Sequence, residues 1–292
     1  MGGLYEIATG VLVATSSYDL TTSTVVAGYS RRCLVIDPAV TVDDLSELTA
    51  GLAARGLRPA VGWSTHPHWD HVLWSRELGD VPRYAAPAAV TIAEAGRDVI
   101  LEEVEKTAPG HDLSLVGRLT PLGASAVAWD GPAAHLVVHD GHAPGHGAVF
   151  LPDSGVLVAG DMCSDVEIPL LDMDAADPLG EYRAGLERLA SLPGVRQVVP
   201  GHGHAGDVGE FRRRVAADFA YLDALELGKP VSDSRLEDCA KWIRTTHEEQ
   251  VRYCQRLTRR VRKDNFPERA WYHAPATGSR STDGRAASRP IS

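Results

Sequence analysis

The segment with the clearest chemical capacity is residues 64–71, which read STHPHWDH and contain the pattern H-x-H-x-D-H. Even with 12 histidines in the chain, chance would produce this pattern with a probability on the order of 10⁻³. If the segment leaves a strand as a loop, His66 and His68 project to the same side and can share one metal ion, while Asp70 and His71 can reach a second. Imidazole and carboxylate ligands without a thiolate suit zinc and also permit iron or manganese.

Three further residues have the right chemistry for the same site. His146 lies in the turn GHAPGHG before an apolar run, Asp161 ends the apolar run VLVAG, and His202 follows the run VVPG. In α/β proteins, loops at the carboxyl ends of strands gather functional side chains. Each residue alone is weak evidence, but together with H-x-H-x-D-H they predict one metal-binding cluster.

The elements that would position these residues alternate between strands and helices. β-branched and aliphatic runs predict strands at 11–15, 22–28, 33–37, 59–64, 135–139, 148–151, 155–159 and 195–199. Helical patterns cover 41–55, with Thr41 as N-cap, and 86–106, 178–192 and 207–227. This order predicts a layered α/β body with helices outside packed sheets.

Composition excludes several classes of protein. The chain has 292 residues and a formal net charge of -10, which disfavours a nucleic-acid binder or a polybasic membrane protein. The first residues show no basic and apolar signal-peptide regions, and no 18-residue apolar run occurs. The four cysteines form no C-x-x-C pair. We therefore expect reduced thiols, a cytoplasmic location, and neither nucleic acid nor membrane as a partner.

The C-terminal part differs from the rest. We expect a catalytic domain over residues 1–228, a helical extension over 229–274 with one long helix from Arg235 to about Arg262, and a disordered tail over 275–292. From Arg252 onward there are ten Lys and Arg against three Asp and Glu. This charge is typical of a solvated tail, with a phosphate- or partner-binding arm as the alternative.

The motifs together resemble the metallo-β-lactamase fold superfamily over roughly residues 5–228. The resemblance implies a four-layer αββα sandwich with the metal site along one edge. It implies a first metal held by His66, His68 and His146, a second held by Asp70, His71 and His202, and Asp161 bridging the two. It also implies that Asp37, at the end of the third predicted strand, braces the metal loop through hydrogen bonds.

The complete ligand set, with the aspartate at position 161, resembles the hydrolase branch that includes glyoxalase II thioesterases and acyl-homoserine lactonases. This implies a binuclear zinc enzyme that attacks an ester, lactone or thioester carbonyl of a small molecule with a metal-bound hydroxide. Asp70 is then the candidate to orient the hydroxide and pass its proton to the leaving group. The alternatives are an oxygenase of the persulfide dioxygenase kind with one iron, a β-lactamase, and a non-catalytic metal-stabilised protein.

Residues around the motifs have weaker predictions. Trp69 is expected to line the cleft, with ordinary packing as the alternative, and His142 either supports the ligands by hydrogen bonds or lies at the surface. The run 162–171 is apolar enough to form a wall of the pocket. The tyrosine that lactonases place shortly after the bridging aspartate is absent here, since Ser164 and Asp165 follow. A homodimer is implied by the resemblance alone.

Overall fold

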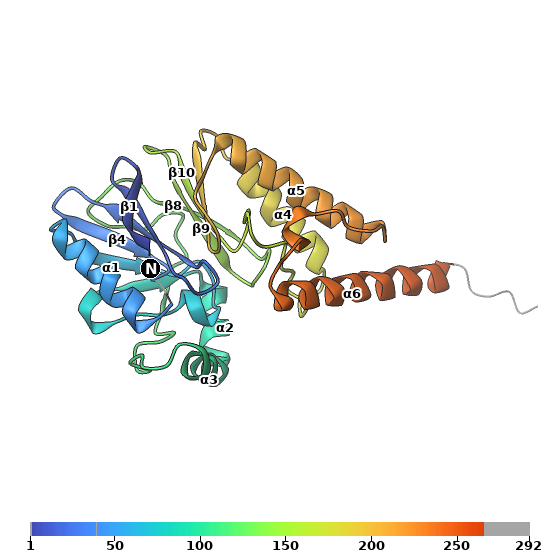
Figure 1. Cartoon of the computed structure of the whole chain (residues 1–292), viewed down its shortest axis with the longest axis horizontal. Helices are drawn as coiled ribbons and strands as arrows, with labels where there is room; N and C mark the ends of the chain where they lie inside the picture. Colours follow the sequence, from blue (N-terminus) through green and yellow to red (C-terminus); the bar gives the residue numbers. More distant parts are fainter. Residues whose placement is uncertain (1, 39, 266–292) are drawn as a thin grey trace, which may run out of the picture.

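The computed structural model describes residues 2–38 and 40–265, with side chains up to residue 257. The predicted tail at 275–292 and the last part of the predicted extension at 229–274 lie outside the described residues. Within the described part the strands form two sheets, and helices cover the outer face of each sheet (Figure 1).

The first sheet has seven strands in sequence order, and its second half is parallel. β1 to β4 form an antiparallel meander, and β4, β5, β6 and β7 then run parallel to one another. The strands are β1 (Gly2–Ala8), β2 (Val11–Thr15), β3 (Thr22–Ala27), β4 (Arg32–Ile36), β5 (Arg58–Trp63), β6 (Arg83–Ala85) and β7 (Thr120–Pro121). β1, β6 and β7 have no counterpart among the predicted strands.

The second sheet has five strands in the order β12-β11-β10-β9-β8. Only β10 and β11 are parallel, so their carboxyl ends meet at one edge. The strands are β8 (His135–His139), β9 (His146–Leu151), β10 (Val156–Gly160), β11 (Gln197–Pro200) and β12 (Gly206–Asp207).

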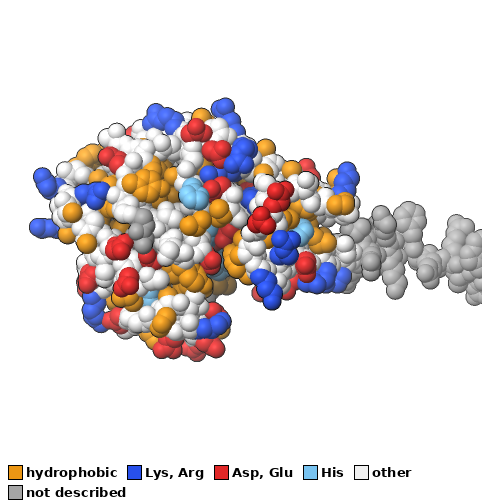
Figure 2. Space-filling model, in the orientation of Figure 1, with side chains coloured by type: hydrophobic (Ala, Val, Ile, Leu, Met, Phe, Trp, Pro, Cys, Tyr) orange, Lys and Arg blue, Asp and Glu red, His pale blue; other side chains and the backbone are white. Residues whose placement is uncertain are grey.

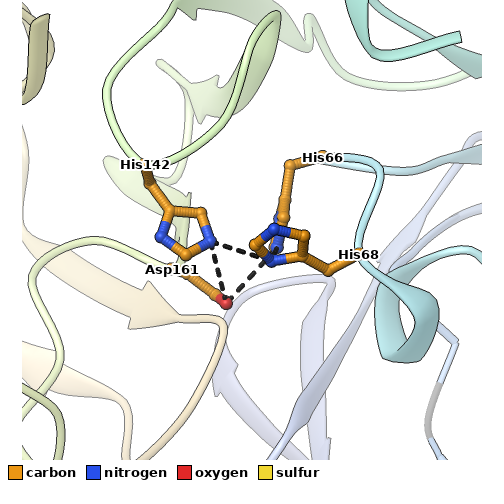
Figure 3. A group of neighbouring side chains, drawn as sticks. All are labelled: His66, His68, His142 and Asp161. Atoms are coloured by element: carbon orange, nitrogen blue, oxygen red, sulfur yellow. Dashed lines mark hydrogen bonds and ion pairs between the residues drawn. The ribbon is translucent and has the colours of Figure 1, made fainter. Parts of the chain in front are cut away.

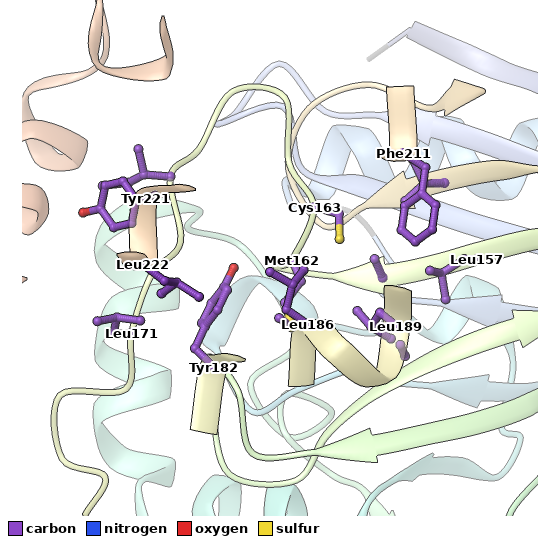
Figure 4. Packing of buried hydrophobic residues seen from close by; sticks show 14 of the residues in the cluster. Leu157, Met162, Cys163, Leu171, Tyr182, Leu186, Leu189, Phe211, Tyr221 and Leu222 are labelled. Carbon is purple, nitrogen blue, oxygen red and sulfur yellow. The ribbon is translucent and has the colours of Figure 1, made fainter. Parts of the chain in front are cut away.

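Three hydrophobic layers follow from the alternation of side chains along the strands. Val11 and Val13 of β2 pack between the two sheets, while Leu12 and Ala14 face the outer helix α1 (Val42–Ala54). On the other side, Leu157 and Ala159 of β10 pack under α4 (Pro178–Ala190) and α5 (Val208–Glu226), as Figure 4 shows for part of this layer. Helix, sheet, sheet and helix are therefore stacked in that order, which confirms the predicted four-layer αββα fold.

The ends of the helices show which local signals were informative. Thr41 caps α1 in a capping box with Asp44, as its position in the sequence predicted. The single helix predicted over 86–106 is wrong, because α2 (Pro87–Ala95) ends at Gly96 and α3 (Arg97–Thr107) begins directly after it. Gly96 adopts non-helical φ/ψ values and serves both helices as a cap.

The chain after residue 228 packs back on the second sheet's helices. A short 3₁₀ helix, η3 (Ser234–Leu236), precedes α6 (Lys241–Asn265), which therefore begins later than the predicted Arg235. Ile243 and Cys254 of α6 are buried in the same hydrophobic layer as Tyr221 and Leu222 of α5. Figure 1 shows α6 running along one side of the body and projecting beyond it.

The described surface carries charges of both signs. Figure 2 shows acidic and basic side chains interspersed over the face in view, with orange hydrophobic groups between them. Among the described residues, no helix combines the length and the apolar character that crossing a bilayer requires.

Candidate metal centre

The predicted ligands converge because they leave adjacent strand ends. The segment 64–71 follows β5 and includes a 3₁₀ turn, η1 (Trp69–His71); Asp161 follows β10 and His202 follows β11. The two sheets are joined at this edge, where the Thr22 backbone N–H donates to the Gly201 carbonyl at 2.7 Å. The histidine-rich segment of the first sheet therefore faces the loops of the second.

One group of four ligand atoms surrounds a single point (Figure 3). His68 Nδ1 lies 3.1 Å from His66 Nε2 and 3.1 Å from His142 Nε2. Asp161 Oδ2 completes the group, 3.3 Å from His66 Nε2 and 3.4 Å from His142 Nε2. Three segments that are separated in the sequence, after β5, before β9 and after β10, thus bring four donor atoms together.

A second group lies beside the first and shares Asp161 with it. His202 Nε2 is 3.2 Å from Asp70 Oδ2 and 3.3 Å from His71 Nε2, and the last two atoms are 3.4 Å apart. The other carboxylate oxygen of Asp161, Oδ1, is 3.2 Å from His71 Nε2. Asp161 therefore offers one oxygen to each group, the position that a bridging ligand occupies.

The spacing of these donors fits divalent metal ions. Four ligands held about 2.0–2.1 Å from a tetrahedral zinc ion lie about 3.3–3.4 Å from one another. The measured separations in both groups fall close to this edge length. Asp161 Oδ1 is also buried with no hydrogen-bond partner in the described structure, a costly state that a metal ion would relieve. The donor set consists of imidazoles and carboxylates, which zinc, iron and manganese all accept.

Asp37 braces the metal loop at its start and at its end. Its Oδ1 accepts a hydrogen bond from the Thr65 backbone N–H at 2.8 Å, and its Oδ2 accepts one from Thr65 Oγ1 at 2.6 Å. Oδ2 also lies 3.1 Å from His71 Nδ1, which fixes the ring so that Nε2 faces the second group.

The turn before β9 places its two histidines differently from the prediction. His142, expected only as support or at the surface, is in the first ligand group, whereas His146, expected as a ligand, is not. His142 has φ +75°, and this left-handed backbone conformation directs its ring into the centre. His146 begins β9 and is fully buried behind His66, with no hydrogen-bond partner for either ring nitrogen among the described residues.

The position of His146 has a local cause. Its ring stacks on His139 with the centroids 4.6 Å apart, beneath Gly160. A Cβ atom at position 160 would collide with His146 Nε2, and Gly160 itself has φ +58°. The glycine before Asp161 therefore makes room for a buried histidine rather than for a ligand.

Glu167 also lies at the site, although it belongs to none of the motifs in the sequence. With Asp161 and His202 it forms a third set of neighbouring donors, and its Oε1 is 3.7 Å from His202 Nδ1. Burial, together with the nearby carboxylates of Asp161 and Asp70, raises the pKa of Glu167 to about 8 against the opposing effect of His202. The available signal was a lone acidic residue inside the apolar run 162–171.

The pKa values divide the histidines into two kinds. Burial lowers the pKa of His66 well below its usual value and that of His142 to about 3, so both rings stay neutral and free to bind a metal. Burial would also lower the pKa of His71 and His202, but nearby carboxylates, Asp161 first among them, raise both well above their usual value. Burial opposes the charge on Asp161, yet His71 and His202 hold its pKa well below the usual range.

A cavity of about 670 Å³ opens over both groups. Trp69, which also packs against a hydrophobic cluster, lines it, and so do Tyr18 and the exposed Trp242 of α6. Apart from the two ligand groups and Glu167, the charged lining residues are three acids and one base, Asp19, Glu103, Asp172 and Lys106. Lys106 Nζ is itself paired with Glu103 at 2.9 Å, so the opening is acidic.

The C-terminal extension holds the wall of this cavity. Arg235, in η3, donates to the backbone carbonyls of Ser164 and Glu167 and forms a 2.6 Å ion pair with Asp218 of α5. Gln250, fully buried in α6, clasps the same wall. It accepts a 2.7 Å hydrogen bond from the Leu171 N–H and donates to the Pro169 carbonyl at 3.0 Å. The run 162–171 thus depends on side chains that lie far along the sequence.

Comparison with protein families agrees with this geometry. Residues 18–202, more than half of the chain, match the model of the metallo-beta-lactamase superfamily. The chain belongs to this superfamily. The match begins at Tyr18 on the rim of the cavity and ends at the ligand His202, so the part of the chain that it covers contains both groups of donors.

Two curated superfamily relatives are hydrolases by name. A hydroxyacylglutathione hydrolase from Cereibacter sphaeroides is 27% identical over 208 residues, which cover 68% of this chain and 73% of the relative. The probable metallo-hydrolase YqgX of Bacillus subtilis is 26% identical over 196 residues, or 61% of this chain and 82% of the relative. Both names support a hydrolase, and the second also refers to a metal.

Solved structures show the same fold. A beta-lactamase domain protein from Burkholderia ambifaria covers 88% of this chain and 88% of its own, with a TM-score of 0.63 and 19% identity, a likeness of fold alone. TTHA1623, solved in a di-iron-bound form, is 28% identical with a TM-score of 0.56, over 69% of this chain and 97% of its own.

Proposed function

We propose that this superfamily member is a binuclear metal-dependent hydrolase, with zinc as its metal, that cleaves an ester, lactone or thioester bond of a small molecule. The observation that carries the proposal is the pair of adjacent donor groups that share Asp161 at the base of a cavity of about 670 Å³. A cavity of this size, with a few converging polar groups, suits a small-molecule substrate.

Each donor has a defined part in this proposal. His66, His68 and His142 would hold the first metal, Asp70, His71 and His202 the second, and Asp161 both. When bound, divalent ions supply a Lewis acid for the carbonyl oxygen and lower the pKa of water to about 7. The neutral state of His66 and His142 leaves their nitrogen lone pairs available without loss of a proton.

Asp70 is the proposed proton carrier. It lines the cavity, and its Oδ2 is fixed at 3.2 Å from His202 Nε2. A carboxylate in that place can orient the attacking water and pass the proton to the leaving oxygen or sulfur. We expect Asp70→Asn to lower kcat by about 10²–10⁴. If the variant keeps two metals and full turnover, Asp70 does not have this role.

The comparisons support the reaction class and leave the metal and the bond to experiment. The hydroxyacylglutathione hydrolase name of one relative favours thioesters, and the di-iron form of TTHA1623 makes iron a candidate beside zinc. The decisive test is metal content per chain by elemental analysis, followed by a hydrolysis screen of neutral and anionic thioesters, lactones and β-lactams. Two zinc ions with thioester, ester or lactone cleavage would support the proposal. One iron with oxygen consumption on persulfides would overturn it.

A further inference from the structure

An apolar groove lies beside the cavity and meets it at the first donor group. It has a volume of about 460 Å³ and runs between α2, α3 and the turn that carries His142. Its apolar wall is formed by side chains from three segments, principally Trp69, Ile92, Val99, Ile100 and Pro144. These residues are far apart in the sequence, so the groove is a product of the fold.

The groove exposes hydrophobic side chains that a folded protein would otherwise bury. Ile92 is 44% exposed and Val99 66% exposed, although both belong to regular helices. Eight large hydrophobic side chains are exposed among the described residues; two line this groove and a third, Trp242, lines the cavity. Exposed apolar groups that gather at one place mark a binding surface rather than the scattered background.

The groove is continuous with the candidate metal centre. Five residues line both spaces, namely His68, Trp69, Glu103, His142 and Asp172. Two of these, His68 and His142, belong to the first donor group. A molecule that lies along the groove therefore ends at the first group, with the cavity open beyond it.

We propose that this groove binds the aliphatic acyl chain of the substrate, with the carbonyl at the first donor group and the leaving group in the cavity. This inference rests on the proposed function and names its substrate class: an unbranched acyl thioester or ester whose leaving group carries no negative charge. Lys106 offsets the charge of Glu103, and the remaining acids of the opening, Asp19 and Asp172, disfavour anionic leaving groups. In the reaction, water gives its hydroxyl to the acyl carbon, the carbon–sulfur or carbon–oxygen bond breaks, and the proton passes to the leaving atom.

The first test is a chain-length series on the metal-loaded full chain. Acetyl, butyryl, hexanoyl and octanoyl thioesters of N-acetylcysteamine share one neutral leaving group and differ only in the acyl chain. Full burial of a methylene corresponds to about fourfold in kcat/KM, so an open groove should give about twofold per methylene. A flat series would overturn the groove as an acyl site.

Substitutions in the groove test whether its side chains cause the dependence of kcat/KM on chain length. Val99→Ser and Ile92→Ser should flatten the series, because each replaces an apolar side chain of the groove by a polar one. Leu227→Ser is the matched control, since Leu227 is 63% exposed at the end of α5, away from the groove. If Leu227→Ser flattens the series equally, or the groove variants do not, the assignment is wrong.

A binding measurement separates this inference from the proposed function. Ketone analogues, in which a methylene group separates the carbonyl carbon from the sulfur, cannot be hydrolysed. Calorimetry can follow their binding to metal-free protein. We expect affinity to rise with chain length in the wild type and not in Val99→Ser. If binding shows this dependence but no thioester or ester is cleaved, the proposed function fails and the groove remains. If Val99→Ser instead dissociates a dimer, a second copy of the chain covers the groove and the inference is overturned.

Discussion

The two halves of the candidate metal centre are built in different ways. The first sheet contributes His66, His68, Asp70 and His71 from one continuous segment of six residues. The second sheet contributes His142, Asp161 and His202 from three separate loops. The first half is positioned by its own sequence and by one brace, Asp37, whereas each part of the second half depends on its neighbours in the fold.

This difference explains where additional support is found. The continuous segment is supported by the hydrogen bonds of Asp37 with Thr65 and by the contact of Asp37 with His71. The loop after Asp161 is held by Arg235 and Gln250 from the C-terminal extension. A centre made from distant loops thus requires more residues outside the centre, and changes in the two halves should have different consequences.

The largest expected effect follows from substitution of Asp161, the ligand that both halves of the centre share. Asp161→Ala should remove the carboxylate that the two groups share, so we expect loss of both metals and a decrease of at least about 10³ in kcat/KM. Elemental analysis and a hydrolysis assay on the same preparation measure the two effects. Asp153→Ala, at an exposed turn, is the control. Retention of one tightly bound metal would mean that the two groups are independent.

The pair of histidines in the turn before β9 sharpens the comparison. His142→Ala should cost about one metal per chain, because a ligand is lost. His146→Ala should keep both metals and lower the free energy of unfolding by about 3 kcal/mol, because a buried ring is replaced by a cavity. Metal content and denaturant unfolding separate the two. The opposite pattern would restore His146 as the ligand.

The hydrogen bonds from Gln250 of α6 to the run 162–171 test whether residues far from the centre stabilise the wall of the cavity. Gln250→Ala removes hydrogen bonds to both Leu171 and Pro169 and leaves buried backbone groups unpaired, so we expect a loss of about 1–3 kcal/mol in stability and a raised KM with two metals retained. Gln255→Ala, at an exposed position on the same helix, should change neither quantity. Equal effects of the two substitutions would show that the hydrogen bonds of Gln250 do not stabilise the wall of the cavity.

A smaller effect concerns pH and the buried histidine His139. Burial, aided by Arg188, lowers its pKa from the usual 6.5 to about 4. Between pH 6.5 and about pH 4, His139 is therefore protonated in the unfolded chain and neutral in the folded chain. The free energy of unfolding falls as the pH decreases through this range. From pH 7 to pH 5 this residue should cost about 2 kcal/mol.

The measurement is denaturant unfolding of metal-free protein at both pH values. His139→Phe keeps a flat ring against His146 and has no group to titrate, so its loss of stability on acidification should be smaller by that amount. An equal loss in the variant and the wild type would exclude His139 as a source of acid sensitivity.

The sequence predicted those features that are determined within a short stretch of chain. The Thr41 cap, the alternating strands and the segment 64–71 each depend on neighbouring residues, and the structure contains all three. The turn with His142 and His146 was predicted less well, since both histidines fit the pattern and only the room under Gly160 decides between them. Glu167 was missed because its burial depends on contacts between loops. The break at Gly96 carried a local signal that the helical pattern around it outweighed.

The supports from η3 and α6 have a consequence for the order of synthesis. A ribosome releases the donors in sequence, and His202, the last of them, emerges well before Arg235 and Gln250. A nascent chain that already carries every donor still lacks the side chains that hold the wall over them. The wall of the cleft is therefore completed only when this part of α6 has been made, and a chain that ends before Gln250 would retain the donors and lack the hydrogen bonds that hold Leu171 and Pro169.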